Sequence, residues 1–146
     1  MSVEIEAVHE VTDELVRAFT RLLPQLSSTA RPLDREALAA LASVDTQTLL
    51  VARVDGEVAG TLTLVVSPLP SGRRAHVEDV VVDTAARGHG VGRALIEHAL
   101  GVAEAAGART VDLTSRPSRE AANRLYERVG FRRRESNVYR YAFEPV

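Results

Sequence analysis

The sequence predicts an α/β fold in which helices pack on both sides of a mixed β-sheet. Short runs of alternating apolar and polar residues, typical of strands, occur near both ends and in the middle of the chain. Longer segments between them carry apolar residues at helical spacing, so strands and helices are interleaved. A length of 146 residues suits one domain with a sizeable core, and we expect residues 1–146 to form a single domain.

The first half of the chain predicts one strand, two helices and a hairpin. Asp55-Gly56, which lies between two apolar runs, is a strong signal for a tight hairpin turn. In order, the expected elements are a strand over 3–7, a helix from Thr12 or Asp13 that weakens at Pro24, a short helix capped by Asp34, and strands over 48–54 and 58–66.

The second half continues the alternation of strands and helices. In order, the expected elements are a strand over 75–83, a helix over 93–106, a strand over 110–114, a helix over 119–129 that ends at Gly130, and a strand-like segment over 131–143. The complete predicted order is β-α-α-β-β-β-α-β-α-β.

A glycine-rich turn, Arg87-Gly88-His89-Gly90-Val91-Gly92, separates the valine-rich strand from the long helix. Such a turn at a helix N-terminus exposes backbone N–H groups where the helix dipole favours negative charge, which indicates a bound phosphate group. The spacing excludes two common phosphate loops. Arg93 stands where a dinucleotide fold needs its third glycine, and the chain contains no lysine, which a nucleoside triphosphate loop requires.

The remaining pattern, Arg-x-x-Gly-x-Gly at Arg87, Gly90 and Gly92, resembles the pyrophosphate loop of the GNAT superfamily of N-acetyltransferases. The resemblance implies the GNAT acyl-CoA N-acyltransferase fold, with acetyl-CoA as cosubstrate. Backbone groups of Val80 and Val82 would then pair with the pantetheine arm, and a neighbouring N–H would bind the developing oxyanion. The implied cofactor contacts come from the strand end and the loop: Val80, Val81, Val82, Arg87, Gly88, His89, Gly90, Val91, Gly92 and Arg93.

Residues 121–131 resemble the closing helix of the same family, in which a tyrosine lies beside the thioester sulfur. Tyr126 takes that place, and a phenol with a pKa of about 10 is suited to protonate the departing thiolate. Family members often carry an asparagine seven residues before the tyrosine, where this chain has Arg119. Asn123, one helical turn from Tyr126, is the candidate that would contact the cofactor instead.

The transfer of an acetyl group to an amine also needs a base, because an alkyl ammonium has a pKa of about 10.4. Glu78 is the first candidate, and His76, Asp79 or a chain of water molecules are the alternatives. Strand alternation puts His76 and Glu78 on one face and Asp79 on the other, unless a bulge intervenes.

The composition narrows the class of function further. A formal net charge of −2 gives no sign of nucleic-acid or membrane binding. The four histidines lack metal-ligand spacing, and we expect no metal. The chain has no cysteine, which excludes a thiol nucleophile and agrees with a reducing compartment. Its first residues show no signal-peptide pattern, and we expect a cytoplasmic protein.

We therefore interpret the chain as an acetyl-CoA-dependent N-acetyltransferase that acts on a primary amine by direct attack in a ternary complex. A small molecule is the favoured acceptor. Two alternatives stay open: an enzyme for protein N-termini or lysines, and a non-catalytic sensor that binds acyl-CoA. The expected partners are acetyl-CoA and the amine acceptor, without nucleic acid or membrane, and a homodimer is an open alternative to a monomer.

Overall fold

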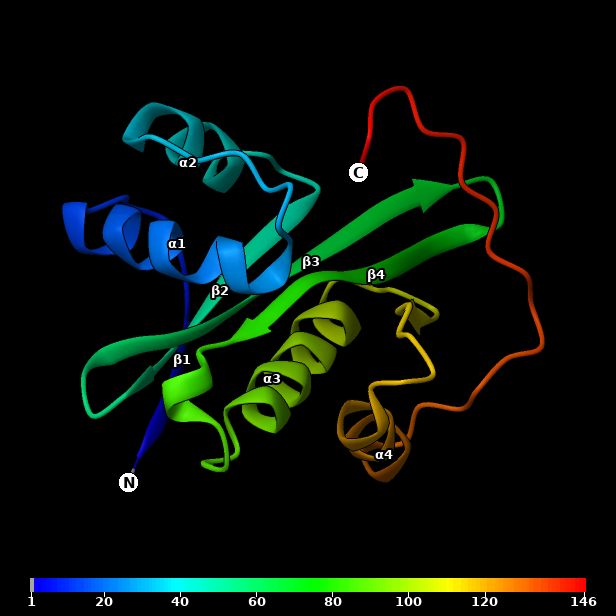
Figure 1. Ribbon diagram of the computed structural model, residues 1–146. Helices are drawn as coiled ribbons and strands as arrows, with labels where there is room; N and C mark the ends of the chain where they lie inside the picture. The colour runs from blue at the N-terminus through cyan, green and yellow to red at the C-terminus, as the bar shows by residue number, and fades with distance from the viewer. Residues whose placement is uncertain (1) are drawn as a thin grey trace. The chain divides into compact units, whose positions relative to one another are not determined.

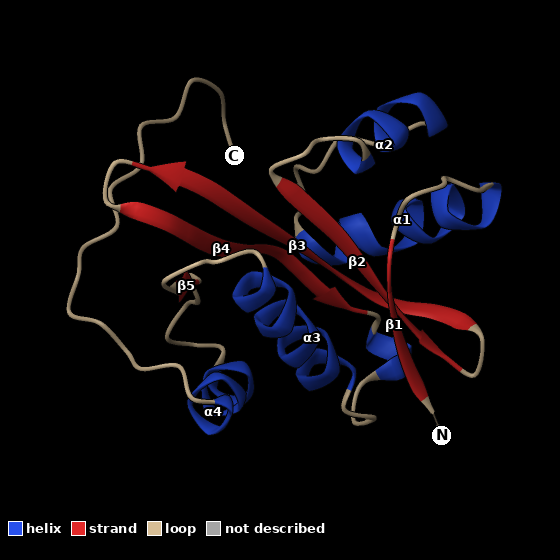
Figure 2. Ribbon diagram, turned by 180° about the vertical axis from the view of Figure 1, so that it is seen from behind, coloured by secondary structure: helices blue, strands red, loops and turns tan. Residues whose placement is uncertain are grey.

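The computed structural model describes residues 2–146 (Figures 1 and 2), and the chain divides into two units, the first ending at Leu113 and the second beginning at Thr114. The first unit contains a five-stranded sheet with the strands in sequence order. Neighbouring strands are antiparallel, except that the last two are parallel. The strands are β1 (Val3–Ala7), β2 (Gln47–Val54), β3 (Glu57–Leu69), β4 (Gly72–Val82) and β5 (Val111–Asp112).

Helices cover both faces of this sheet. The first unit contains α1 (Asp13–Leu26), α2 (Arg35–Ala42), the short 3-10 helix η1 (Thr84–Ala86) and α3 (Val91–Ala105). Figures 1 and 2 show α1 and α2 on one face and α3 on the other. On the first face Leu15, Phe19 and Leu22 of α1 pack with buried residues of the sheet such as Val51 and Val81. The mixed α/β prediction is therefore confirmed.

The β2–β3 hairpin forms where the sequence predicts it. Asp55 has φ of 50° and Gly56 has φ of 86°, the left-handed conformations that a tight turn with the right-handed twist of its strands requires. β3 and β4 form a second, longer hairpin that extends to Leu69 and Gly72. Within residues 2–146, no helix is long and apolar enough to cross a membrane.

Several predicted boundaries are wrong. β3 extends to Leu69 rather than ending at residue 66, and β4 begins at Gly72 rather than at residue 75. α1 continues through Pro24 to Leu26 instead of weakening at the proline. α3 begins at Val91 rather than Arg93, so Gly92 lies in its first turn and not in the preceding loop. β5 contains only Val111 and Asp112, whereas the sequence predicted a strand over 110–114.

The second unit contains α4 (Glu120–Val129) and the segment that follows it. The prediction of a strand over 131–143 is wrong, because residues 131–146 form neither strand nor helix. Tyr139, Tyr141 and Phe143 are 84–95% exposed, although their alternating pattern is typical of a strand. β-branched and aromatic residues favour a strand only where it can pair with a neighbour, and this segment pairs with no strand of the described residues. The expectation of a single domain stays a prediction.

Candidate active site

The outer half of β4 lacks a strand neighbour on one side. β5 pairs with β4 only at Ala75 and His76. Within the described part of the chain, residues 77–82 therefore present an unpaired edge of N–H and carbonyl groups. Val80, Val81 and Val82, which were predicted to contact the cofactor, all lie on this edge. An extended molecule with amide groups could pair with it as a strand would.

A β-bulge lies in the middle of the same segment. Thr61 pairs with Val81 and Thr63 with Glu78, so two residues of β4, Asp79 and Val80, oppose one residue of β3. Asp79 has φ of 50°, an uncommon conformation that aspartate tolerates better than most residues. Thr61 and Thr63 lie on one face of β3, so their partners Val81 and Glu78 share a face of β4. The bulge interrupts the alternation of side chains, which therefore no longer predicts the face on which Asp79 lies. Glu78 and Asp79 are both exposed.

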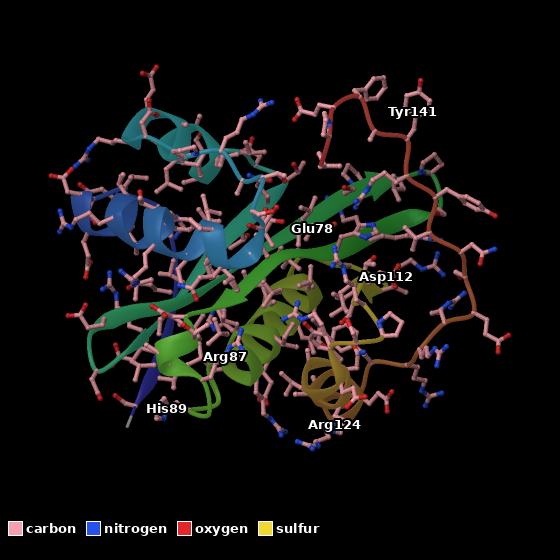
Figure 3. The ribbon with its side chains drawn as sticks, viewed as in Figure 1. Glu78, Arg87, His89, Asp112, Arg124 and Tyr141 are labelled. Carbon is pink, nitrogen blue, oxygen red and sulfur yellow. The ribbon has the colours of Figure 1, made fainter. Side chains whose placement is uncertain are left out.

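The glycine loop follows directly after β4 and η1. Gly88 and Gly90 have φ of 87° and 75°, which explains why glycine stands at both positions. No described heavy atom lies within 4 Å of the place a Cβ would take at either residue, so the backbone of the loop is open to solvent. No described side chain caps α3 at Gly90, which leaves the first N–H groups of the helix available to an anion. Figure 3 shows Arg87 and His89 on this loop.

The N-terminus of α3 is held close to the sheet at Gly60. A Cβ on Gly60 would lie 3.0 Å from the carbonyl oxygen of Val81, 3.1 Å from Val91 Cγ1 and 3.3 Å from Leu95 Cδ1. Only glycine leaves room for this approach. The bulge, the unpaired edge and the first turn of α3 are thereby brought together around the end of β4.

Tyr126 and Asn123 belong to the second unit, on α4. Tyr126 is 9% exposed, and its ring meets Phe131 edge to face at a centroid distance of 5.9 Å. Burial raises the pKa of its phenol above the ordinary value, while the charge of Arg119 acts weakly in the other direction. Asn123 Nδ2 donates a hydrogen bond to the carbonyl of Arg116 at 3.0 Å. The predicted contact between Asn123 and the cofactor stays a prediction.

Two features of the structure were missed by the sequence analysis. The hydroxyl of Ser115 is buried without a hydrogen-bond partner among the described residues, which is a costly state for a polar atom. Arg21 on α1 binds Asp83, the residue that follows β4. No sequence signal could have found this pair, because 62 residues separate its members.

A cleft of about 260 Å³ lies elsewhere in the first unit, near the C-terminal end of α3. It is lined by residues of the α2–β2 connection, of β2, of the β3–β4 hairpin and of the C-terminal end of α3, none of which was predicted as a site residue: Asp45, Thr46, Thr48, Val66, Pro68, Arg73, Val102 and Ala106. The candidate site is therefore the open surface around the end of β4 and not this cleft.

Comparison with known proteins identifies the family of the chain. The model of the acetyltransferase (GNAT) family matches residues 8–131, which include the strand, the glycine loop and α4. The chain belongs to the GNAT acetyltransferase family. It has the GNAT fold and is an N-acetyltransferase.

Among its relatives, glucosamine 6-phosphate N-acetyltransferase of Trypanosoma brucei brucei is 35% identical over 75% of this chain and 78% of that protein. Glucosamine 6-phosphate N-acetyltransferase 1 of Oryza sativa subsp. japonica is 40% identical over 60% of this chain and 61% of that protein. A solved acetyltransferase of Trypanosoma brucei superposes with a TM-score of 0.77 and 27% identity, covering 97% of this chain and all of that one.

GNAT acetyltransferases use acetyl-CoA, and three observations of this GNAT chain fit such a molecule. Gly88 and Gly90 carry no side chain and have open space at the Cβ position, so an anion can approach the backbone of the turn. The guanidinium of Arg87 beside it is exposed and makes no hydrogen bond or ion pair with residues 2–146. The unpaired edge of β4 offers backbone donors and acceptors to an amide-bearing arm.

Proposed function

We propose that this GNAT enzyme transfers the acetyl group of acetyl-CoA to the primary amine of a small amino-sugar phosphate. The two relatives named above support this acceptor class, since both are named glucosamine 6-phosphate N-acetyltransferase. The charge distribution supports a phosphate-bearing ligand: eight arginines and four carboxylate residues lie in the segment 114–146.

The cofactor site comprises the glycine loop and the strand edge. When bound, acetyl-CoA supplies an activated acetyl thioester. Backbone N–H groups from Gly88 to Gly92 and the guanidinium of Arg87 would hold its pyrophosphate, because bare N–H groups at a helix N-terminus favour an anion. The unpaired edge over 77–82 would hold the pantetheine arm.

The remaining roles concern protons and developing charge. Glu78 accepts the proton of the acceptor amine, directly or through one water molecule. An N–H at the Asp79–Val80 bulge donates a hydrogen bond to the oxygen on which negative charge develops. A phenol with an ordinary pKa of about 10 is protonated at neutral pH, and burial raises the pKa of Tyr126 further, so its hydroxyl can give a proton to the leaving sulfur. No covalent acetyl-enzyme is needed, and the chain has no cysteine to form one.

The observation that carries the acetyl-CoA site of this proposal is the combination on one strand end of an unpaired edge, a bulge at Asp79 and a helix that begins at an uncapped glycine, while the acceptor class is supported by the two relatives. The test is a screen for thiol release from acetyl-CoA. Candidate acceptors are glucosamine 6-phosphate, glucosamine, polyamines, aminoglycosides, amino acids and peptides.

We expect the highest kcat/KM with the amino-sugar phosphate and a lower value with glucosamine, which lacks the phosphate. Turnover with peptides alone would instead favour the alternative of protein acetylation. Binding of acetyl-CoA without turnover on any acceptor would favour the sensor module.

Two further expectations belong to the same proposal. We propose a cytoplasmic location, which the absence of cysteine supports. A homodimer stays a prediction, and light scattering coupled to size-exclusion chromatography would decide between 15.8 kDa and twice that mass.

A further inference from the structure

Two side chains of α1 bind the segment that leads into the glycine loop. Arg21 Nε donates to Asp83 Oδ2 at 2.9 Å, and Gln25 Oε1 accepts from the N–H of Thr84 at 3.0 Å. Arg21 and Gln25 lie four residues apart, on one face of the helix. Asp83 and Thr84 are the first residues after β4. Figure 1 shows α1 lying across the sheet toward the strand end from which η1 leaves.

Asp83 connects this contact to the local backbone. Its Oδ1 accepts from the N–H of Ala85 at 3.1 Å, and its own N–H donates to the carbonyl of Ala59 at 2.7 Å. A second nitrogen of Arg21 donates to the carbonyl of Val58 at 2.7 Å. One carboxylate therefore binds both Arg21 and the first turn of η1. The direction in which the chain leaves β4 depends on this shared contact.

The loop that follows has little else to define its shape. Gly88 and Gly90 carry no side chain, and no described heavy atom would touch a Cβ at either position. Glycine backbone loses more conformational freedom than any other when it is ordered. A loop without packing contacts keeps its geometry through its two ends. α3 fixes one end, and the Asp83 contacts fix the other.

We propose that Arg21 is a positioning residue for the cofactor loop: it holds Asp83, and through Asp83 the segment up to Gly90, in the geometry that binds a pyrophosphate group. This inference rests on the proposed function, since it takes the glycine loop as the cofactor site. A ligand binds more tightly to a loop that is already ordered, because less ordering has to accompany binding. Loss of Arg21 therefore weakens cofactor affinity.

A purely structural role for Arg21 predicts a different result. The side chain of Arg21 is 47% exposed and that of Asp83 is 15% exposed, and an ion pair with one solvent-exposed partner contributes little to stability. A positioning role predicts a loss of affinity in a chain whose thermal midpoint hardly changes. A structural role predicts a fall in the thermal midpoint.

The experiment is calorimetric titration of the purified full chain with coenzyme A. The variants are Arg21→Met, which keeps the aliphatic stem, Asp83→Asn, and the double variant. Arg17→Met is the matched control, because Arg17 is an exposed arginine one turn earlier on the same helix. Arg21→Lys tests whether a retained charge recovers part of the affinity.

We expect Arg21→Met and Asp83→Asn each to raise the Kd for coenzyme A about 5- to 20-fold, within the usual range of coupling between sites. The double variant should be no weaker than the weaker single variant, because both remove the same contact. Arg17→Met should bind like the wild type. The thermal midpoints of the free variants should stay within about 4 °C of the wild type.

Unchanged affinity in Arg21→Met and Asp83→Asn, with normal binding by the wild type, would overturn this proposal alone. Fully additive effects in the double variant, or a large fall in the thermal midpoint with Arg21→Met, would also overturn it, in favour of independent or structural roles. If the wild type binds no coenzyme A, the proposed function fails and this inference fails with it.

Discussion

The close approach of α3 to the sheet at Gly60 allows a quantitative prediction for the substitution Gly60→Ala. The new methyl group would lie 3.0 Å from the carbonyl oxygen of Val81, 3.1 Å from Val91 Cγ1 and 3.3 Å from Leu95 Cδ1. These distances are shorter than ordinary contact. Val91 and Leu95 are 2% and 0% exposed, so neither side chain can move into solvent.

Two opposing contributions determine the size of the effect. Overpacking a tight core position costs about 1–3 kcal/mol. Alanine also restricts the unfolded chain relative to glycine, which stabilises by about 0.4–1 kcal/mol. We therefore expect Gly60→Ala to lower the free energy of unfolding by about 1–2 kcal/mol. Because Val91 is the first residue of α3, its displacement should also weaken binding of coenzyme A at the loop.

Urea unfolding at neutral pH, followed by circular dichroism, measures the change in stability. Gly101→Ala is the matched control: Gly101 lies inside α3, and no described heavy atom lies within 4 Å of its Cβ position. Alanine in an exposed helix interior should stabilise the chain by about 0.5–1 kcal/mol. The same substitution should thus have opposite signs at the two sites. A Gly60→Ala variant as stable as the wild type would refute the close packing of α3 on β3 and β4.

Three further predictions concern proton transfer and pH. Tyr126→Phe keeps the ring contact with Phe131, so coenzyme A affinity should hold while kcat falls about 10²–10⁴-fold; a wild-type kcat would make the tyrosine a packing residue only. Glu78→Gln should lower the rate mainly at neutral pH and less at high pH, where more of the amine is already neutral; an unchanged pH–rate profile together with loss of activity in His76→Ala would assign the base to His76 instead. Hydrogen bonds from the N–H of Ala85 and, to a smaller extent, from Arg21 hold the pKa of the Asp83 carboxyl below its ordinary value of 3.8. The ionised carboxylate therefore contributes stability above pH 3.8, and this contribution is lost as the pH falls through the lowered pKa. Asp83→Asn should therefore lose less stability than the wild type as the pH is lowered below 3.8, measured by urea midpoints. Equal losses would show that the charged form of Asp83 is not stabilised by these contacts.

Local signals in the sequence predicted much of the architecture. The hairpin at Asp55-Gly56 and the order of elements up to α4 depend on turn chemistry and periodicity, which act over a few residues. The start of α3 was placed two residues late because the glycines suggested a loop, whereas Gly92 is helical. A glycine that opens a helix and a glycine inside its first turn look the same in a sequence.

Features that depend on pairing between distant segments could not be predicted. The segment 131–143 has the composition of a strand, but its state depends on whether a partner strand is available. The bulge at Asp79 arises from the register between β3 and β4. From the sequence, the faces of this strand could be assigned only on the condition that no bulge intervened. The contact of Arg21 with Asp83 requires that α1 cross the sheet near the end of β4, which only the folded chain reveals.

The central claim is that the backbone of the glycine loop binds the pyrophosphate of acetyl-CoA, and it is tested most directly by calorimetry of coenzyme A with Gly90→Val. Gly107 provides a matched control, since it follows the other end of α3 with φ of 81° against 75° at Gly90, and both positions have open space at the Cβ. Valine is strained to a similar degree at either site, so the two variants should lose similar stability. We predict that Gly90→Val weakens coenzyme A binding severely while Gly107→Val binds like the wild type. Equal affinity in the two folded variants would contradict the claim.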